Sequence, residues 1–93
     1  MTEKRHIILT THAQQRLRRR LPHINVEEFQ KQIERRVQRG DWVSTQGGRF
    51  AVKVEHDYRY AWAVIELLSE HRVRVVTVLK PGWRIDPVVP ATG

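Results

Sequence analysis

Three residues near the N-terminus have the types and the spacing to act on a phosphodiester. His12, Arg16 and Arg20 are four residues apart, so on a helix they lie in one stripe. Guanidinium groups hold phosphate and stabilise added negative charge, and an imidazole can accept or donate a proton near neutral pH. The same spacing also fits solvated arginines beside a histidine that makes a local hydrogen bond, and spacing alone favours neither interpretation.

A second group of candidates follows the last apolar stretch of the chain. Lys80, Trp83 and Arg84 place two cations and an aromatic ring around a Pro-Gly pair, which suits a base stacked above a held phosphate. The alternative is that Trp83 caps a sheet edge and that Lys80 ends a strand. Tyr60 is a further candidate, although aromatic residues in strands more often serve packing.

The positive charge of the chain is concentrated in its first 40 residues. The 93 residues include 17 Lys and Arg against 10 Asp and Glu, a formal net charge of +7. Residues 1–40 carry ten basic and four acidic side chains, a net charge of +6. Thirteen of the cations are arginine, whose planar fork suits phosphate. A polyanionic partner is therefore expected, and Arg19 joins Arg20 among the residues expected to hold it.

The composition also excludes several classes of protein. Cysteine is absent, which excludes disulfides, thiolate zinc sites and cysteine nucleophiles. The five histidines include no His-x-x-x-His pair, so neither a metal site nor a cofactor is expected. No apolar run is long enough to cross a membrane, and nothing resembles a secretory signal, so we expect a cytoplasmic protein with no membrane partner.

The elements that must position these candidates follow a simple order. Apolar spacing predicts a short strand over 6–10 and helices over 11–20 and 26–39. Four strands follow over 42–46, 49–55, 58–68 and 73–80, with Gly47-Gly48 as the first hairpin turn. A strand, two helices and a meander of about four antiparallel strands make an α+β fold. The length predicts one domain over 1–86, followed by a loose tail over 87–93.

Local signals fix the helix ends more sharply than the other boundaries. Thr11 and Gln14 have the spacing of a capping box, as do Asn25 and Glu28. Gly40 supplies the stop of the second helix. The last strand is almost continuously apolar, so it is either covered on both faces or central in the sheet.

Motif and element order together resemble a known family. Thr11-His12-Ala13, Arg16 and Arg20, a second capped helix and a late Val75-Val76-Thr77 strand resemble the small His-Ala-x-x-Arg-x-x-x-Arg domains grouped with the RelE/ParE toxin superfamily. The BrnT toxins are a more remote resemblance. The resemblance implies a basic α+β fold, often encoded on phages or mobile elements, whose relatives cleave RNA without a metal or bind an antitoxin.

Three interpretations remain open from the sequence. In a RelE-like endoribonuclease, the catalytic residues would be His12, Arg16 and Lys80. The RNA would be bound by the remaining candidates, which are Arg19, Arg20, Tyr60, Trp83 and Arg84. In the alternative, a non-catalytic phage or mobile-element protein uses the same basic face to bind nucleic acid or to inhibit a host protein. A third interpretation makes that face the docking surface of an antitoxin.

Overall fold

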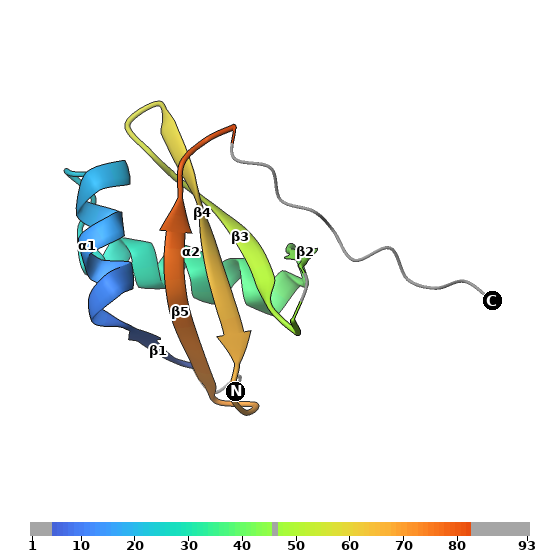
Figure 1. The fold of residues 1–93 in the computed structure, drawn as a ribbon. Helices are drawn as coiled ribbons and strands as arrows, with labels where there is room; N and C mark the ends of the chain where they lie inside the picture. The colour runs from blue at the N-terminus through green and yellow to red at the C-terminus, as the bar shows by residue number, and fades with distance from the viewer. Residues whose placement is uncertain (1–4, 46, 83–93) are drawn as a thin grey trace.

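The protein folds as two helices against one face of a mixed five-stranded sheet (Figure 1). The structure is a computed structural model that describes residues 5–45 and 47–82, and every structural statement concerns these residues. The elements are β1 (His6–Leu9), α1 (Thr11–Arg20), α2 (Val26–Arg39), β2 (Val43–Ser44), β3 (Phe50–His56), β4 (Arg59–Leu67) and β5 (Arg72–Leu79). The α+β prediction is therefore confirmed. The predicted tail over 87–93 lies outside the described residues.

The sheet has the strand order β1-β5-β4-β3-β2. Strands β2 to β5 form an antiparallel meander, and β1 pairs with β5 in parallel, with Ile7 opposite Val73. The last strand thus lies inside the sheet, between β1 and β4, which explains its nearly continuous apolar sequence. The register shifts between Val64 and Ile65, where Ile65 pairs with Val75 and Val64 pairs with Thr77, so Val76 is the extra residue of a bulge.

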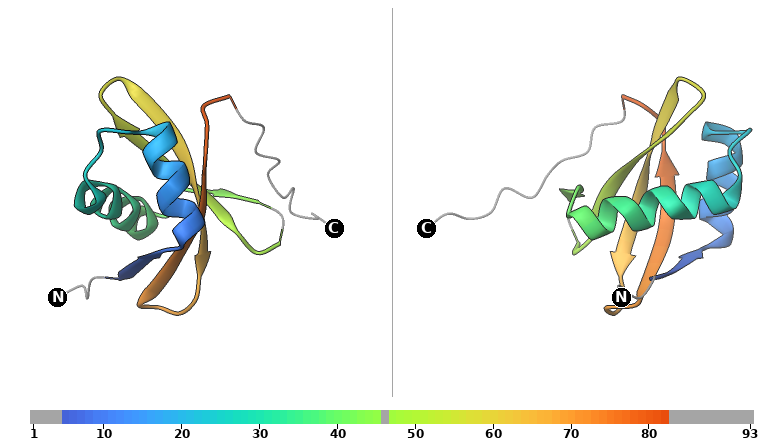
Figure 2. Two further views of the ribbon diagram at one scale, coloured as in Figure 1. Left: turned by 60° about the vertical axis from the view of Figure 1, so that its left-hand side comes forward. Right: turned by 180° about the vertical axis from the view of Figure 1, so that it is seen from behind.

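Both helices cover the same face of the sheet, as Figure 2 shows from two sides. Helix α1 packs mainly against β5, and α2 packs against β3 and β1. The largest fully buried side chains include Phe29 and Ile33 from α2, Leu21 from the end of α1, and Ile65 from β4. The apolar faces of the helices and the inward-facing side chains of the strands therefore form one core.

The predicted helix bounds are confirmed, but one predicted cap is wrong. Thr10, not Thr11, is the N-cap of α1, because its side chain accepts a hydrogen bond from the N–H of Ala13 at 3.0 Å. Asn25 caps α2 as predicted, accepting from the N–H of Glu27 at 2.8 Å. Gly40 ends α2 with a φ of 68°, a conformation that glycine adopts without steric strain.

The strand bounds differ from those predicted: β1 ends at Leu9, not at residue 10, β3 is Phe50–His56 instead of 49–55, and β5 is Arg72–Leu79 instead of 73–80. Strand β2 contains only Val43–Ser44 instead of 42–46, and Gln46 lies outside the described residues. Strand β4 begins at Arg59, not at Tyr58. Asp57 and Tyr58 instead form the turn between β3 and β4, with φ angles of 52° and 64°. His56 pairs with Arg59, so Asp57 and Tyr58 are the whole loop of a tight hairpin.

This hairpin turn has no glycine in either left-handed position. Two-residue turns with positive φ at both central positions strongly prefer Asn-Gly or Asp-Gly. Tyr58 occupies the glycine position, and its side chain is fully exposed. The ring therefore contributes no burial that would offset the steric strain of its backbone.

Tyr58→Gly should stabilise the protein for this reason. Removing the Cβ from a left-handed position should raise the free energy of unfolding by about 0.5 to 1 kcal/mol. The thermal midpoint should rise by about 2 to 8 °C in a domain of this size. Tyr58→Ala is the matched control, because it removes the ring but keeps the Cβ, and should show no comparable gain. Equal gains for both variants would assign the strain to the ring instead of the backbone.

Candidate nucleic-acid interface

Helix α1 carries a dense group of cations without acidic neighbours on the same helix. Its ten residues contain Arg16, Arg18, Arg19 and Arg20 and no Asp or Glu. The ion pairs of the described residues use other cations, namely Arg5, Arg36, Arg49, Lys53 and Arg74. Within the described part of the chain, no carboxylate neutralises an arginine of α1. These guanidiniums are therefore available to an external anion.

The stripe predicted on α1 lies partly at the boundary of the core. Arg16 and Arg20 are partly buried beside the fully packed Ala13 and Leu17, whereas His12 is exposed. The Nε atom of Arg20 is buried and has no hydrogen-bond partner among the described residues. The stem of Arg20 is thus held by the core. Helical geometry separates successive members of the stripe by about 6 Å along the axis.

The C-terminal end of α1 lies at the same end of the molecule as the β3–β4 turn and the end of β5 (Figures 1 and 2). Leu21, Pro22 and His23 line a hollow of about 130 Å³ together with His56, Asp57 and Arg59, so the end of α1 and the turn are neighbours. Trp62 pairs with Leu79, which places Lys80 near the start of β4. We call this region, residues 19–23, 56–60 and 80, the hairpin end.

The structure brings some of the predicted site residues together and separates others. Arg19, Arg20, Tyr60 and Lys80 all belong to the hairpin end. His12 belongs to the opposite end of α1, next to the Thr10 cap. Trp83 and Arg84 lie outside the described residues.

The backbone positions of the predicted catalytic residues His12, Arg16 and Lys80 are spread along α1 and the end of β5. The N–H of Thr10 bonds to the carbonyl of Val75, and its hydroxyl donates to the carbonyl of Val76 at 3.2 Å. Lys80 lies four residues beyond Val76, about 13 Å farther along the strand. His12 follows Thr10 closely, so α1 places Arg16 between the levels of His12 and Lys80.

Tyr60 lies on the sheet face that the helices leave open, where it has partners. Its ring meets Trp62 edge-on, with ring centroids 6.4 Å apart and planes at 89°. The ammonium group of Lys53 lies 4.6 Å from the Tyr60 ring centroid and 3.4 Å from a carboxylate oxygen of Glu55. These contacts are the packing role that the sequence offered as the alternative for Tyr60.

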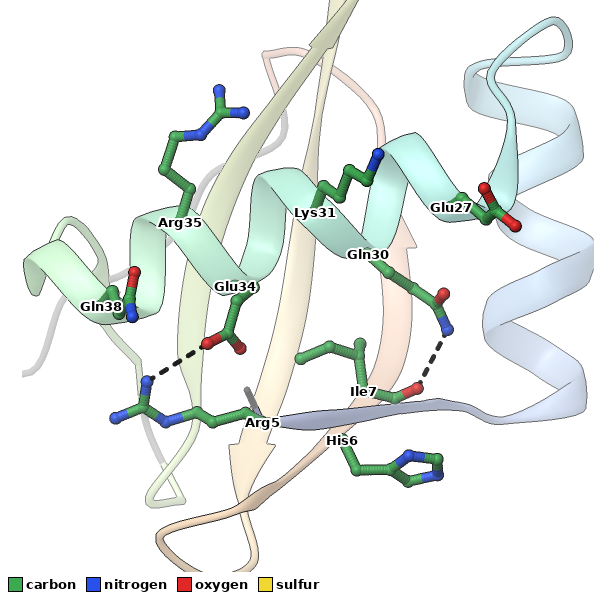
Figure 3. Close-up of a pocket in the computed structure, with 9 residues that line it drawn as sticks. All are labelled: Arg5, His6, Ile7, Glu27, Gln30, Lys31, Glu34, Arg35 and Gln38. Carbon is green, nitrogen blue, oxygen red and sulfur yellow. Dashed lines mark hydrogen bonds and ion pairs between the residues drawn. The ribbon is translucent and has the colours of Figure 1, made fainter. Parts of the chain in front are cut away.

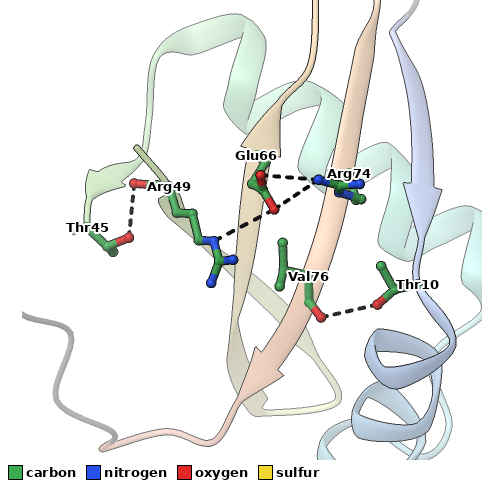
Figure 4. A network of polar contacts seen from close by, with 6 residues as sticks. All are labelled: Thr10, Thr45, Arg49, Glu66, Arg74 and Val76. Atoms are coloured by element: carbon green, nitrogen blue, oxygen red, sulfur yellow. Dashed lines mark hydrogen bonds and ion pairs between the residues drawn. The ribbon is translucent and has the colours of Figure 1, made fainter. Parts of the chain in front are cut away.

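The same open face carries two arginines that the sequence pattern did not single out (Figure 4). Arg49 and Arg74 approach Glu66 from either side, at 3.7 and 3.3 Å. Alternation along β4 and β5 would have placed Glu66 and Arg74 on one face, but their pairing depends on the strand register. Because one carboxylate serves both cations, this face has less free positive charge than α1.

A hollow of about 530 Å³ lies between β1 and α2 (Figure 3). Arg5 approaches Glu34 at 3.8 Å, and the side-chain amide of Gln30 donates to the carbonyl of Ile7 at 3.1 Å. Both carboxylate oxygens of Glu34 are buried and without a hydrogen-bond partner in the described part of the chain. None of the α1 arginines lines this hollow, so we do not assign the nucleic-acid interface to it.

The described chain offers no ready metal centre. Among residues 5–45 and 47–82, no group of three or more His, Asp or Glu side chains could hold a metal ion. No helix in that part of the chain is both long and apolar enough to span a membrane.

The fold can be related to a known family only by the order of its helices and strands. No protein-family model matches the chain, and neither the curated proteins nor the solved structures include a match. The order β-αα-ββββ, with two helices on one face of the sheet, is consistent with RelE-like topology.

Proposed function

We propose that the protein is a toxin-like RNA-binding protein, a divergent member of the RelE/ParE superfamily, and that it holds RNA along α1 and the hairpin end. The observation that carries the proposal is the set of four α1 arginines with no carboxylate partner among the described residues. A stable fold does not require such a cluster, because like charges on one short helix repel each other. The resemblance to the RelE/ParE superfamily suggests an antitoxin or a host protein as a second partner.

The arrangement of the stripe favours a chain-like anion over a small one. His12, Arg16 and Arg20 follow one another along α1 beside β5, and Lys80 continues the line past the end of that strand. A positively charged track of this kind suits the backbone of a nucleic acid, whose phosphates repeat along the strand. A compact phosphate ligand would need these groups to converge on one point.

Cleavage of the bound RNA is a second candidate function, and His12 is the residue that favours it. Its side chain is exposed at the start of the stripe, next to Arg16. RNA supplies its own nucleophile in the 2′-hydroxyl, so one general acid-base group and a phosphate clamp could suffice. The separation of His12 from Lys80 makes binding the function that the geometry supports better.

The binding proposal predicts a specific loss in an α1 variant. Arg16→Gln with Arg19→Gln should weaken binding of a single-stranded RNA by about 10- to 100-fold, since charge-assisted hydrogen bonds to phosphate are removed. The slope of log K against log salt should fall in magnitude by about 1.4, or about 0.7 for each phosphate that is no longer neutralised. Fluorescence anisotropy across a salt series measures both quantities.

A charge-matched variant on α2 is the control for this experiment. Arg35→Gln with Arg39→Gln removes two cations from the other helix, so the net charge is the same in both variants. The control should weaken binding by less than about threefold at moderate salt, where distant charges are screened. Equal losses for both pairs would show non-specific attraction by net charge and would contradict an interface on α1.

The α1 cations should contribute little to stability. Arg18→Gln and Arg19→Gln should each change the free energy of unfolding by less than about 0.5 kcal/mol. Both side chains are exposed and have no partner among the described residues, so the substitutions remove no stabilising contact. Urea denaturation of each variant measures this change. A decrease above about 1 kcal/mol would indicate a structural role and weaken the argument from unpaired charge.

Cleavage is tested with purified protein and labelled RNA, with and without EDTA. If the protein is an endoribonuclease of the expected type, cleavage persists in EDTA and His12→Ala abolishes it while RNA affinity stays within about twofold of the wild type. If the protein binds the RNA but the RNA stays intact, the cleavage proposal is wrong and the non-catalytic alternative is supported. Cleavage that survives both His12→Ala and Arg16→Ala would show that the reacting residues lie elsewhere.

A further inference from the structure

Tyr58 is the most exposed large hydrophobic side chain of the described residues, and it occupies a strained backbone position. It follows Asp57 in the two-residue loop of the β3–β4 hairpin, and both residues have positive φ angles. A short polar residue such as Asp tolerates this conformation, whereas a tyrosine does so only with steric strain. The loop therefore presents an aromatic ring where glycine would fit better.

Two hollows lie beside the β3–β4 loop, and cationic and imidazole side chains line them. One hollow of about 420 Å³ is lined by residues 55–60, including both Tyr58 and Tyr60. A smaller hollow on the side of α1 is lined by His23, His56 and Arg59 among others. Two carboxylates, Glu55 and Asp57, also line the larger hollow, and Glu55 lies 3.4 Å from Lys53. A flat ring that enters the larger hollow would lie beside Tyr58, Arg59 and Tyr60, which line it.

We propose that Tyr58 stacks on an unpaired base of the bound RNA, with Arg59 and the neighbouring imidazoles directed toward the flanking phosphates. This inference rests on the proposed RNA-binding function and specifies its substrate class as single-stranded or looped RNA. A base inside a duplex already stacks on both faces and cannot accept the ring, whereas a splayed base can. Arg19 and Arg20 end α1 directly before Leu21, Pro22 and His23, which line the smaller hollow together with the loop, so one strand can contact both features.

An RNA strand without bases separates stacking from backbone contacts. The probes are a labelled single-stranded RNA of about 12 nucleotides, the same strand with abasic sites throughout, and a duplex of the same length, all measured by anisotropy at one salt concentration. Tyr58→Ala should weaken binding of the intact strand by about 5- to 100-fold, the range for one base stacked on an aromatic side chain. It should leave binding of the abasic strand and of the duplex unchanged within about twofold.

Two further variants separate the ring from the hydroxyl and from the backbone. Tyr58→Phe should bind the intact strand as the wild type does, because it keeps the ring. Tyr58→Gly should lose affinity as Tyr58→Ala does, although it has a higher thermal midpoint than the wild type. A variant that is more stable and yet binds more weakly cannot have lost affinity through unfolding.

The failures of the two proposals are distinguishable. Loss of binding in the Arg16→Gln, Arg19→Gln pair with no effect of Tyr58→Ala would overturn the stacking proposal, leave RNA binding in place, and point to a protein contact for Tyr58. An equal loss for the intact and abasic strands, or in Tyr58→Phe, would also overturn stacking. No binding of any RNA by the wild type would overturn both.

Discussion

The position of α1 depends on one side chain, the hydroxyl of Thr10. Its oxygen accepts the N–H of Ala13 and so begins the helix, and the same hydroxyl donates to the carbonyl of Val76 at the bulge of β5. The N–H of Thr10 also bonds to the carbonyl of Val75. Two hydrogen bonds thus tie Thr10 to the interior strand of the sheet, and a third begins the helix. The direction of the stripe on α1 is set at this point.

The tie at Thr10 also explains how the sheet is closed at this side. Strand β1 pairs with β5 only as far as Val75, and α1 packs against β5. Helix α1 therefore packs along the second half of β5, where β1 no longer pairs with that strand. At the other side of the sheet, the side-chain amide of Gln32 both donates to the carbonyl of Glu55 and accepts its N–H, at 2.7 and 2.9 Å. Each helix protects one stretch of strand edge.

Local signals are sufficient to predict the helices but not to choose between adjacent threonines. Asn25 and Gly40 act within a few residues of themselves, so their sequence positions predict the ends of α2. Local criteria favour Thr11, which has Gln14 at capping-box spacing, whereas the cap at Thr10 is accompanied by a hydrogen bond to Val76, 66 residues away. The parallel pairing of β1 with β5 is a long-range contact of the same kind.

The candidate site shows the same division between local and long-range information. Helical spacing places His12, Arg16 and Arg20 in one stripe, because spacing on a helix is local. The distance from His12 to Lys80 depends on where α1 docks against β5, and the sequence could not supply it. The sequence predicts that Tyr58 begins a strand, because aromatic residues favour strands and a strand follows it. A two-residue hairpin loop with two left-handed residues and no glycine has no familiar sequence signal.

The hairpin end is also where features that the fold does not need coincide. The core is built from apolar side chains of both helices and the sheet, and no polar residue in the described part of the chain is buried within it. Uncompensated arginines raise the repulsion within α1, and a tyrosine in a left-handed turn strains the β3–β4 hairpin. The two features have separate physical origins, since one is electrostatic and the other steric. Both features occur at the end of the molecule where we propose that RNA binds, and one shared ligand would account for both.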